Sequence, residues 1–344
     1  MTRRPLTNLA DLTKAGLLPE VEQPTLRAAE EAFSIRLTPQ VLSTIKAANH
    51  SDPVYAQYMP RAGEMLTADD DVADPIGDAA HEKVKGLVHR YPDRVLLKPV
   101  LTCQVYCRFC FRREKIAKED SSLSTTQLNV AYDYIATHPE VFEVILTGGD
   151  PLVLSDRRLA DILQRLSAIP HVQVLRIHSR VPVVDPARTT PALVKILRAG
   201  KPLSMVVHAN HAQEIDESVA AAFARLVDGG IPLFSQSVLL KGVNNSVAAL
   251  DTLFRRLVSL RVKPYYLHHP DKTAGTSHFR LSLKEGQALT AALRGKLSGL
   301  ALPTYVLDIP GGYGKVPVGV QHIEEVNGEI FIIAPDGSPH RYRE

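Results

Sequence analysis

All three cysteines of this 344-residue chain lie within one stretch of eight residues. Cys103, Cys107 and Cys110 have the spacing CxxxCxxC. Three thiolates can bind three irons of a [4Fe–4S] cluster and leave the fourth iron open to a small molecule. The spacing therefore indicates a loop that holds a reactive cluster, and the chemistry of that open iron is the first function to consider.

Two other uses of these thiols are weaker interpretations. A disulfide framework favours an even number of cysteines in a short secreted chain, whereas this chain has three. A structural zinc site needs four ligands, usually as two separated pairs, so one of the 13 histidines would have to supply the fourth. Zinc remains the second interpretation, after the iron–sulfur cluster.

The composition is that of an ordinary globular protein, with 45% hydrophobic and 22% charged residues. The formal net charge of +3 is small and no basic stripe is present, so we expect no nucleic-acid partner. No apolar run reaches the length of a membrane span and the N-terminus has no secretory signal, so we expect no membrane partner. Clustered thiols without a signal predict a cytoplasmic protein.

The pattern of apolar residues changes near residue 90. Residues 1–90 are predicted to be mainly helical, because apolar residues recur at helical spacing at 9–18 and 41–45. Farther along, short apolar runs alternate with amphipathic stretches. The predicted strands are Val95–Leu101, Glu143–Thr147, Val172–Ile177, Leu203–Val207, Leu233–Leu239 and Pro264–Leu267. The predicted helices are Thr126–Thr137, Arg157–Ile169, Pro191–Ala199, Glu214–Val227, Val247–Arg261 and Leu283–Leu297.

Six successive strand–helix pairs predict an α/β fold with a parallel sheet and right-handed crossovers. Both a doubly wound sheet and a barrel-like (β/α)n array satisfy this order. No GxGxxG motif follows the first strand, so dinucleotide binding has little support. Asn327-Gly328 lies between two apolar runs and predicts a hairpin over 323–333, in a small C-terminal β extension.

Polar residues follow most of the predicted strands at the end where each strand finishes. They are the cysteine loop, Gly148-Gly149-Asp150, His178-Ser179-Arg180, His208 with Asn210 and His211, and His268-His269 with Asp271, while Ser235-Gln236-Ser237 lies within the fifth strand. In a barrel-like array, active sites lie at the carboxyl ends of the strands. We therefore predict that these side chains meet in one site.

Taken in order, the motifs resemble the lysine 2,3-aminomutase family of radical S-adenosylmethionine (SAM) enzymes, including its shorter members linked to elongation factor P. Besides the cysteine and Gly-Gly-Asp loops, they are His89–Arg94, Cys110–Arg113, Ser235–Leu240, Tyr265–Leu267, Ser277–Phe279 and Asp308–Pro317. The resemblance implies a partial (β/α)6 TIM-like barrel of the radical SAM type. It would comprise an N-terminal mainly helical region (1–90), the barrel (91–300) and a C-terminal segment with the cofactor lysine and a β-hairpin (301–344).

The resemblance also implies three cofactors: a [4Fe–4S] cluster, SAM and pyridoxal 5′-phosphate (PLP). Cys103, Cys107 and Cys110 would bind three irons, and SAM would bind the fourth. Lys315 matches the catalytic lysine that forms a Schiff base with PLP, which needs a lowered amine pKa. The other cofactor-binding positions are Arg90, Tyr91 and Arg94 near the PLP phosphate, Gly148, Gly149 and Asp150 near the methionine end of SAM, and Gln236.

Three further matches imply the substrate. Arg112 matches the position that binds the substrate α-carboxylate, and Asp271 and Asp308 match two acids that bind the ε-ammonium of lysine. Two acids favour a cationic amino acid, because an unpaired buried charge is costly. The resemblance thus implies an isomerase that converts L-lysine to β-lysine by 2,3-amino migration. It would use a reducing electron donor such as flavodoxin or ferredoxin, and a homo-oligomer is left open.

Two other functions are kept as alternatives. A radical SAM and PLP-dependent mutase acting on another amino acid would bind PLP but turn over little lysine. A non-catalytic zinc or iron–sulfur module would not cleave SAM. Within the leading hypothesis, β-lysine is either a free metabolite or is attached to elongation factor P.

Overall fold

The computed structural model describes residues 4–116 and 122–343, and within these ranges ten strands form one sheet in chain order. The strands from β3 to β9 pair in parallel, whereas the first two and the last join through antiparallel pairs. They are β1 (Glu82–Val84), β2 (Leu87–Tyr91), β3 (Arg94–Val100), β4 (Glu143–Gly148), β5 (Val174–Ser179), β6 (Leu203–His208), β7 (Leu233–Val238), β8 (Val262–His268), β9 (Thr304–Ile309) and β10 (Gly314–Pro317).

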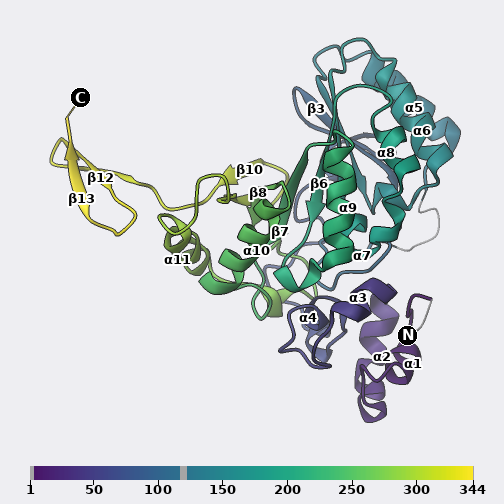
Figure 1. Ribbon diagram of the computed structural model, residues 1–344, viewed down its shortest axis with the longest axis horizontal. Coiled ribbons are helices and arrows are strands. Elements are labelled where there is room, and N and C mark those ends of the chain that lie inside the picture. Colours follow the sequence, from purple (N-terminus) through teal and green to yellow (C-terminus); the bar gives the residue numbers. More distant parts are fainter. Residues whose placement is uncertain (1–3, 117–121, 344) are drawn as a thin grey trace.

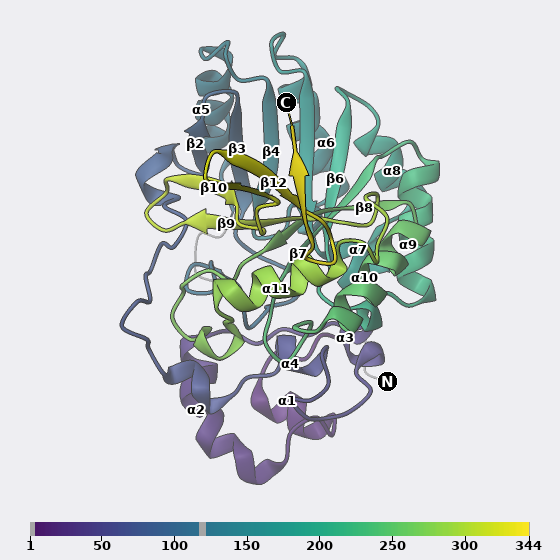
Figure 2. The same cartoon turned by 90° about the vertical axis from the view of Figure 1, so that its left-hand side faces the viewer.

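A helix crosses between each pair of successive parallel strands. These helices are α5 (Thr125–Ala136), α6 (Asp156–Ser167), α8 (Pro191–Leu197), α9 (Glu217–Asp228), α10 (Val247–Ser259) and α11 (Leu283–Leu293). Strand order that follows the chain excludes a doubly wound sheet, in which the order reverses at a switch point. The predicted α/β class and barrel-like (β/α)6 array are therefore confirmed, as an open sheet with α8, α9 and α10 in succession along one side (Figures 1 and 2).

All six predicted strands and all six predicted helices of this region are confirmed, with ends displaced by a few residues. The helix α6 shows why the pattern was readable, since Leu159, Ile162, Leu163 and Leu166 recur at helical spacing and are all buried. The strand β4 is buried from its second residue onward, as expected for a parallel strand covered on both faces.

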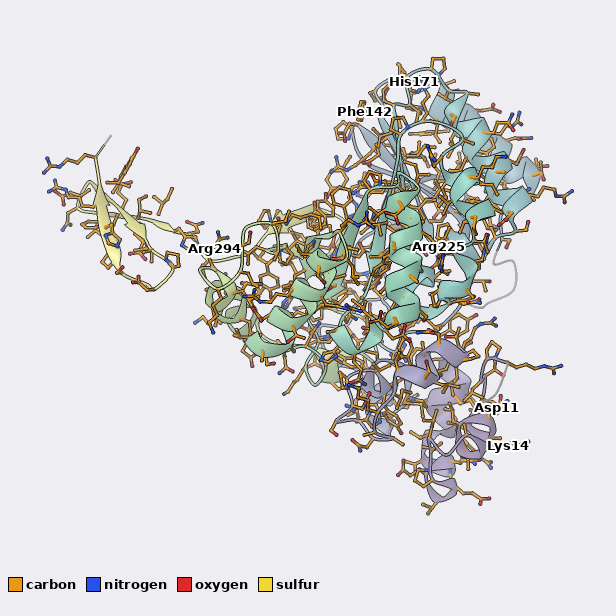
Figure 3. All side chains as sticks on the ribbon, viewed as in Figure 1. Asp11, Lys14, Phe142, His171, Arg225 and Arg294 are labelled. Atoms are coloured by element: carbon orange, nitrogen blue, oxygen red, sulfur yellow. The ribbon has the colours of Figure 1, made fainter. Side chains whose placement is uncertain are left out.

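Several strands were not predicted. β1 and β2 lie at the end of the region expected to be mainly helical, and β9 and β10 extend the sheet beyond the sixth unit. The predicted C-terminal hairpin is confirmed, with Asn327 and Gly328 both at positive φ, but it belongs to a three-stranded sheet. Side chains project from both faces of that sheet, which extends away from the main body (Figure 3). Its strands are β11 (Ile323–Val326), β12 (Glu329–Ile333) and β13 (Pro339–Tyr342).

The N-terminal helices pack against the loops at the carboxyl ends of the parallel strands. Thr38 donates to the carbonyl of Val184 after β5, and Gln57 donates to Glu214 after β6 at 3.2 Å. This region therefore covers the end of the sheet where the predicted site lies. Its helices are α1 (Leu9–Lys14), α2 (Gln23–Ala32), α3 (Pro39–Thr44) and α4 (Tyr55–Tyr58). Within the described residues, no helix combines the length and the apolar character that crossing a membrane requires.

A buried ion-pair network ties the N-terminal region to the cysteine loop. The Glu64 carboxylate accepts from Arg108 Nε at 2.9 Å and also pairs with the guanidinium of Arg113. Arg108 donates in turn to the carbonyl of Ser34 at 3.1 Å, and Arg113 to that of Gly275 at 2.9 Å. Glu64 is 2% exposed, so its carboxylate supplies the buried negative charge that balances the positive charges of Arg108 and Arg113.

Replacement of Glu64 by glutamine is expected to destabilise the fold by about 3 kcal/mol, because two buried guanidinium groups lose their shared anion. Urea or thermal unfolding of the two proteins would measure this difference. The matched control is Glu217→Gln, which removes an exposed partner of Arg256 and should cost less than about 0.5 kcal/mol. Equal stability of Glu64→Gln and the wild type would show that the network does not hold the loop.

Candidate active site

One cavity of about 540 Å³ is lined by side chains of the parallel strands and of the loops that follow them. Its size and its mixture of apolar and polar walls are typical of a ligand site. The structure brings all of the predicted site residues to the wall of this cavity. They are Arg90, Tyr91, Arg94, Cys103, Cys107, Cys110, Arg112, Gly148, Gly149, Asp150, Gln236, Asp271, Asp308 and Lys315.

The three cysteines form one end of the cavity and are partly exposed to it. Burial raises the pKa of all three thiols, and that of Cys107 to about 11. Thiolates would therefore need a nearby cation, which the irons of a cluster supply. Over the described ranges, no three His, Cys, Asp or Glu side chains converge as ligands of one metal ion. In a [4Fe–4S] cluster each thiolate binds a different iron, so the donor set fits that group.

Gly148 and Gly149 pack against the start of the cysteine loop. Gly148 has φ of +116°, and a Cβ on Gly149 would lie 2.3 Å from the carbonyl oxygen of Thr102. The amide of Gly149 also donates to the carbonyl of Val100 at 2.8 Å. We predicted these glycines for a close approach to SAM. In the structure, contact between the two loops already requires both of them.

The Asp150 carboxylate has partners within the protein. Its oxygens accept hydrogen bonds from Ser179 Oγ at 2.7 Å and from the amides of Leu152, Arg180 and Val181 at 3.1, 2.7 and 3.1 Å. Burial nevertheless raises the pKa of this carboxyl group. Asp150 therefore fixes the loop after β5 as well as lining the cavity.

Lys315 and Asp308 face each other across a β-hairpin. The antiparallel register of β9 and β10 places Lys315 directly opposite Asp308, so both side chains point into the cavity. The Lys315 ammonium pairs with the Asp308 carboxylate and lies 3.3 Å from His268 Nδ1. The amide of Lys315 donates to the Tyr91 hydroxyl at 2.7 Å, which fixes the backbone of the hairpin against β2. An enclosed amine held by two polar side chains fits the position of a cofactor lysine.

The two acids near Lys315 have opposite electrostatic environments. Burial alone would raise the pKa of Asp308, but its contacts with His268 and Lys315 lower it below the usual range. Burial, assisted by the charge of Asp308, raises the pKa of Asp271 to about 7. Asp308 is therefore ionised and paired with Lys315. The carboxyl group of Asp271 is instead partly protonated near neutral pH.

Arg112 has an acidic partner that sequence reasoning missed. Its Nη2 and Nε atoms lie 2.7 and 3.2 Å from Asp78 Oδ2, and Nη1 lies 3.4 Å from the carbonyl of Gly148. Asp78 is 3% exposed and also lies within ion-pair distance of Lys98 and Arg90, at 3.5 and 3.6 Å. It therefore fixes the Nε side of the guanidinium. No sequence signal distinguishes Asp78 from the acids around it in the loop.

Basic side chains gather at the other end of the cavity. Arg94 lies over the Tyr91 ring at 3.9 Å, and Arg176 pairs with Glu143 at 2.7 Å. The buried Nε atoms of Arg90 and Arg176 have no hydrogen-bond partner among the described residues. Arginine side chains on the wall of a cavity fit an anionic group such as a phosphate, because a guanidinium pairs with phosphate oxygens. Arg176 was not predicted, because it lies within a strand and outside every recognised motif.

Three histidines complete the wall between these ends. His178, His208 and His268 lie at the carboxyl ends of β5, β6 and β8. Burial lowers the pKa of each, so all three are neutral at neutral pH. Within the described part of the chain, the Nε2 atom of each has no hydrogen-bond partner. Their positions after strands were noted in the sequence, but no role was assigned to them there.

An open parallel (β/α) array with a CxxxCxxC loop after its first parallel strand defines the class of radical SAM enzymes. No family model matches the chain. It is 43% identical over 317 residues to L-lysine 2,3-aminomutase of Acetoanaerobium sticklandii, covering 92% of this chain and 76% of that one. It thus belongs to the L-lysine 2,3-aminomutase family and is an isomerase.

Two other relatives are informative, one because its length is similar to that of this chain and one because its name gives a different substrate. L-lysine 2,3-aminomutase of Escherichia coli is 38% identical, with 86% of each chain covered. Glutamate 2,3-aminomutase of Clostridioides difficile is 34% identical, covering 92% of this chain and 75% of that one. Among solved structures, Streptococcus suis SuiB bound to S-adenosylmethionine is similar with a TM-score of 0.47 and 13% identity, covering 67% of this chain and 53% of that one.

Proposed function

We propose that this aminomutase acts on L-lysine and moves its amino group from C2 to C3, using a [4Fe–4S] cluster, SAM and PLP. The observation that supports the proposal is the single cavity that Cys107, Arg112, Asp271 and Lys315 all line. One cavity gives the cluster ligands, the charged anchors and the cofactor lysine access to the same substrate molecule. Their shared cavity supports the roles that the family resemblance implies for them.

The charges of the cavity favour lysine over glutamate. Arg112 offers a cation to the α-carboxylate, and Asp271 and Asp308 offer anions to a distant ammonium. A glutamate side chain would bring a third carboxylate against these two acids, and burying like charges together is costly. Glutamate, the substrate in the name of one relative, is therefore the alternative substrate. The presence of both Asp271 and Asp308 disfavours glutamate in this cavity.

When bound, the reduced cluster and SAM would supply a radical that abstracts hydrogen, and PLP would supply a conjugated system that stabilises the resulting carbon radical. The chain's own groups prepare this chemistry. Lys315 must lose a proton to act as a nucleophile. The Asp308 carboxylate pairs with its ammonium and, with His268 Nδ1 at 3.3 Å, holds the amine in the cavity. Arg90, Tyr91 and Arg94 would hold the phosphate. Apolar walls that include Leu240 exclude water.

The direct test is anaerobic incubation of the reconstituted, reduced protein with lysine, SAM and PLP. We expect β-lysine to accumulate, with parallel incubations on glutamate giving far less β-product. Absence of β-lysine from a protein that binds iron, SAM and PLP would refute the substrate assignment. Absence of SAM cleavage under reducing conditions would instead favour the non-catalytic module.

The affinity for lysine is expected to rise about tenfold from about pH 6 to about pH 8. The raised pKa of Asp271, about 7, leaves its carboxyl group mostly protonated below neutrality and ionised above it. A cationic ammonium binds the ionised carboxylate, so lysine binding weakens as the pH falls through this pKa. The pH dependence of KM would reveal the effect, and Asp271→Asn should flatten that profile. A wild-type profile as flat as that of the variant would contradict the assignment.

The partners and the fate of the product rest on the resemblance. A low-potential flavodoxin or ferredoxin is the proposed electron donor, and a cytoplasmic location and a homo-oligomer stay predictions. β-Lysine is either released as a free metabolite or attached to elongation factor P. Chiral chromatography of (S)- against (R)-β-lysine, together with a transfer assay on elongation factor P, would separate these two fates.

A further inference from the structure

A buried arginine touches one of the cysteine sulfurs. Arg180, which follows β5, is 6% exposed, and its Nη1 atom lies 3.1 Å from Cys107 Sγ. The guanidinium also lies 5.1 Å from the centre of the Tyr58 ring and 5.3 Å from that of Phe109. An arginine guanidinium stays protonated in proteins. A permanent positive charge therefore stands against the cysteine loop.

The other edge of the guanidinium is fixed by a buried carboxylate and a buried amide. Nη2 lies 2.5 Å from Glu214 Oε2 and 2.7 Å from Gln57 Oε1. Glu214 is 3% exposed, and its second oxygen accepts from the amides of Asn210 and His211 at 2.8 and 2.9 Å. The backbone carbonyl of Gln57 accepts from the amide of Arg108 within the cysteine loop at 2.8 Å. Arg180 is thus held in one orientation, with its Nη1 atom toward the sulfur.

We propose that Arg180 is a positioning residue that raises the reduction potential of the cluster by donating to the Cys107 sulfur, and that Glu214 opposes this effect. The proposal rests on the [4Fe–4S] cluster of the proposed function. The step concerned is the uptake of one electron by [4Fe–4S]²⁺ from a low-potential one-electron reductant to give [4Fe–4S]⁺. Hydrogen bonds to the sulfurs and nearby charge are established determinants of such potentials.

The sign of each contribution follows from Coulomb's law. Reduction adds a negative charge to the cluster, so a fixed cation and an N–H donor at the ligand sulfur favour the reduced state. A carboxylate next to that cation disfavours the reduced state, because it neutralises part of the same charge. Replacing Arg180 and replacing Glu214 should therefore shift the potential in opposite directions.

The test is a redox titration of reconstituted protein, followed by electron paramagnetic resonance of the [4Fe–4S]⁺ state, in the absence of SAM. Arg180→Gln should lower the ratio of reduced to oxidised cluster at a fixed potential by about tenfold, equivalent to 59 mV for one electron. Glu214→Gln should raise that ratio, and Arg180→Lys should retain most of the wild-type value. Arg188→Gln is the control, because Arg188 lies nearby in the chain and donates to Leu152 and Leu154 carbonyls instead.

Opposite shifts in Arg180→Gln and Glu214→Gln would support the proposal, since general loosening of the site would move both variants in the same direction. Unchanged potentials in both, or shifts of the same sign, would overturn it. If either glutamine variant fails to fold, the remaining one and Arg180→Lys still give a signed result. Failure of the wild-type protein to bind a cluster would refute the proposed function itself and is recognised separately from its iron content.

Discussion

Replacement of Lys315 by alanine is expected to lower the rate of β-lysine formation on the order of 10³-fold or more, while the cluster still assembles. Lys315 lies opposite Asp308 in the β9–β10 hairpin, and its amine points into the cavity. Alanine removes the only atom of this residue that can bond to an aldehyde, and the partners of that atom among the described residues are the side chains of Asp308 and His268. The loss should therefore be chemical rather than structural.

A second readout distinguishes this role from a general effect on activity. Borohydride reduction of the PLP-loaded wild type should fix a phosphopyridoxyl group on the peptide that contains Lys315, as measured by mass spectrometry. The control is Lys272→Ala, which removes a half-exposed ammonium paired with Asp70 and should retain activity. A fixed group on another lysine, or a fully active Lys315→Ala protein, would show that Lys315 does not hold the cofactor.

Replacement of Asp271 by asparagine is expected to raise KM for lysine by about 10²–10³-fold, because an ammonium left unpaired in a buried site costs about 3–4 kcal/mol. Asp271 is the cleaner target of the two acids, because Asp308 also pairs with Lys315. Initial rates over a wide range of lysine concentration would separate KM from kcat. The cost should fall mainly on KM, since the ammonium is distant from the reacting carbons.

The matched chemical control is 2-aminohexanoate, which has the six-carbon chain of lysine without its ε-ammonium. Its binding constant should differ by less than a few-fold between the wild type and Asp271→Asn. Asp251→Asn, which changes a partly exposed helix residue paired with Arg255, is the protein control. If Asp271→Asn bound lysine and the neutral analogue with unchanged affinities, the ammonium site would have to be elsewhere.

Much of the fold was readable from local patterns. Parallel strands such as β4 are short apolar runs, and helices such as α6 bury residues at a regular spacing. Buried elements of this kind therefore produce a recognisable pattern of apolar residues in the sequence. Strands without that pattern were missed. β2 has a burial pattern that ends in partly exposed residues, and β10 begins with Gly314 in a turn-rich stretch, so neither resembles a buried strand. Their pairing comes from tertiary contacts at the two edges of the sheet.

The site was predictable only as far as its motifs extend. The cysteines, Arg112, Asp271 and Lys315 carry recognisable spacing or sequence context, and the structure brings them to one cavity. The charged residues that pair with these side chains have no recognisable spacing or sequence context. Asp78 reaches Arg112 from 34 positions away, and Arg180 reaches Cys107 from 73 positions away. Such pairs have no periodicity and depend on how loops meet, so physical reasoning from one sequence cannot place them.

Electron paramagnetic resonance of the reduced enzyme, frozen during turnover with SAM, PLP and lysine, tests the central claim most directly. If the cluster and Lys315 serve one cavity, an organic radical should appear, and ¹³C at the reacting carbons of lysine should broaden its signal. Omitting PLP or replacing Lys315 by alanine should abolish the signal. A protein that cleaves SAM but gives no radical altered by labelled lysine would contradict the account.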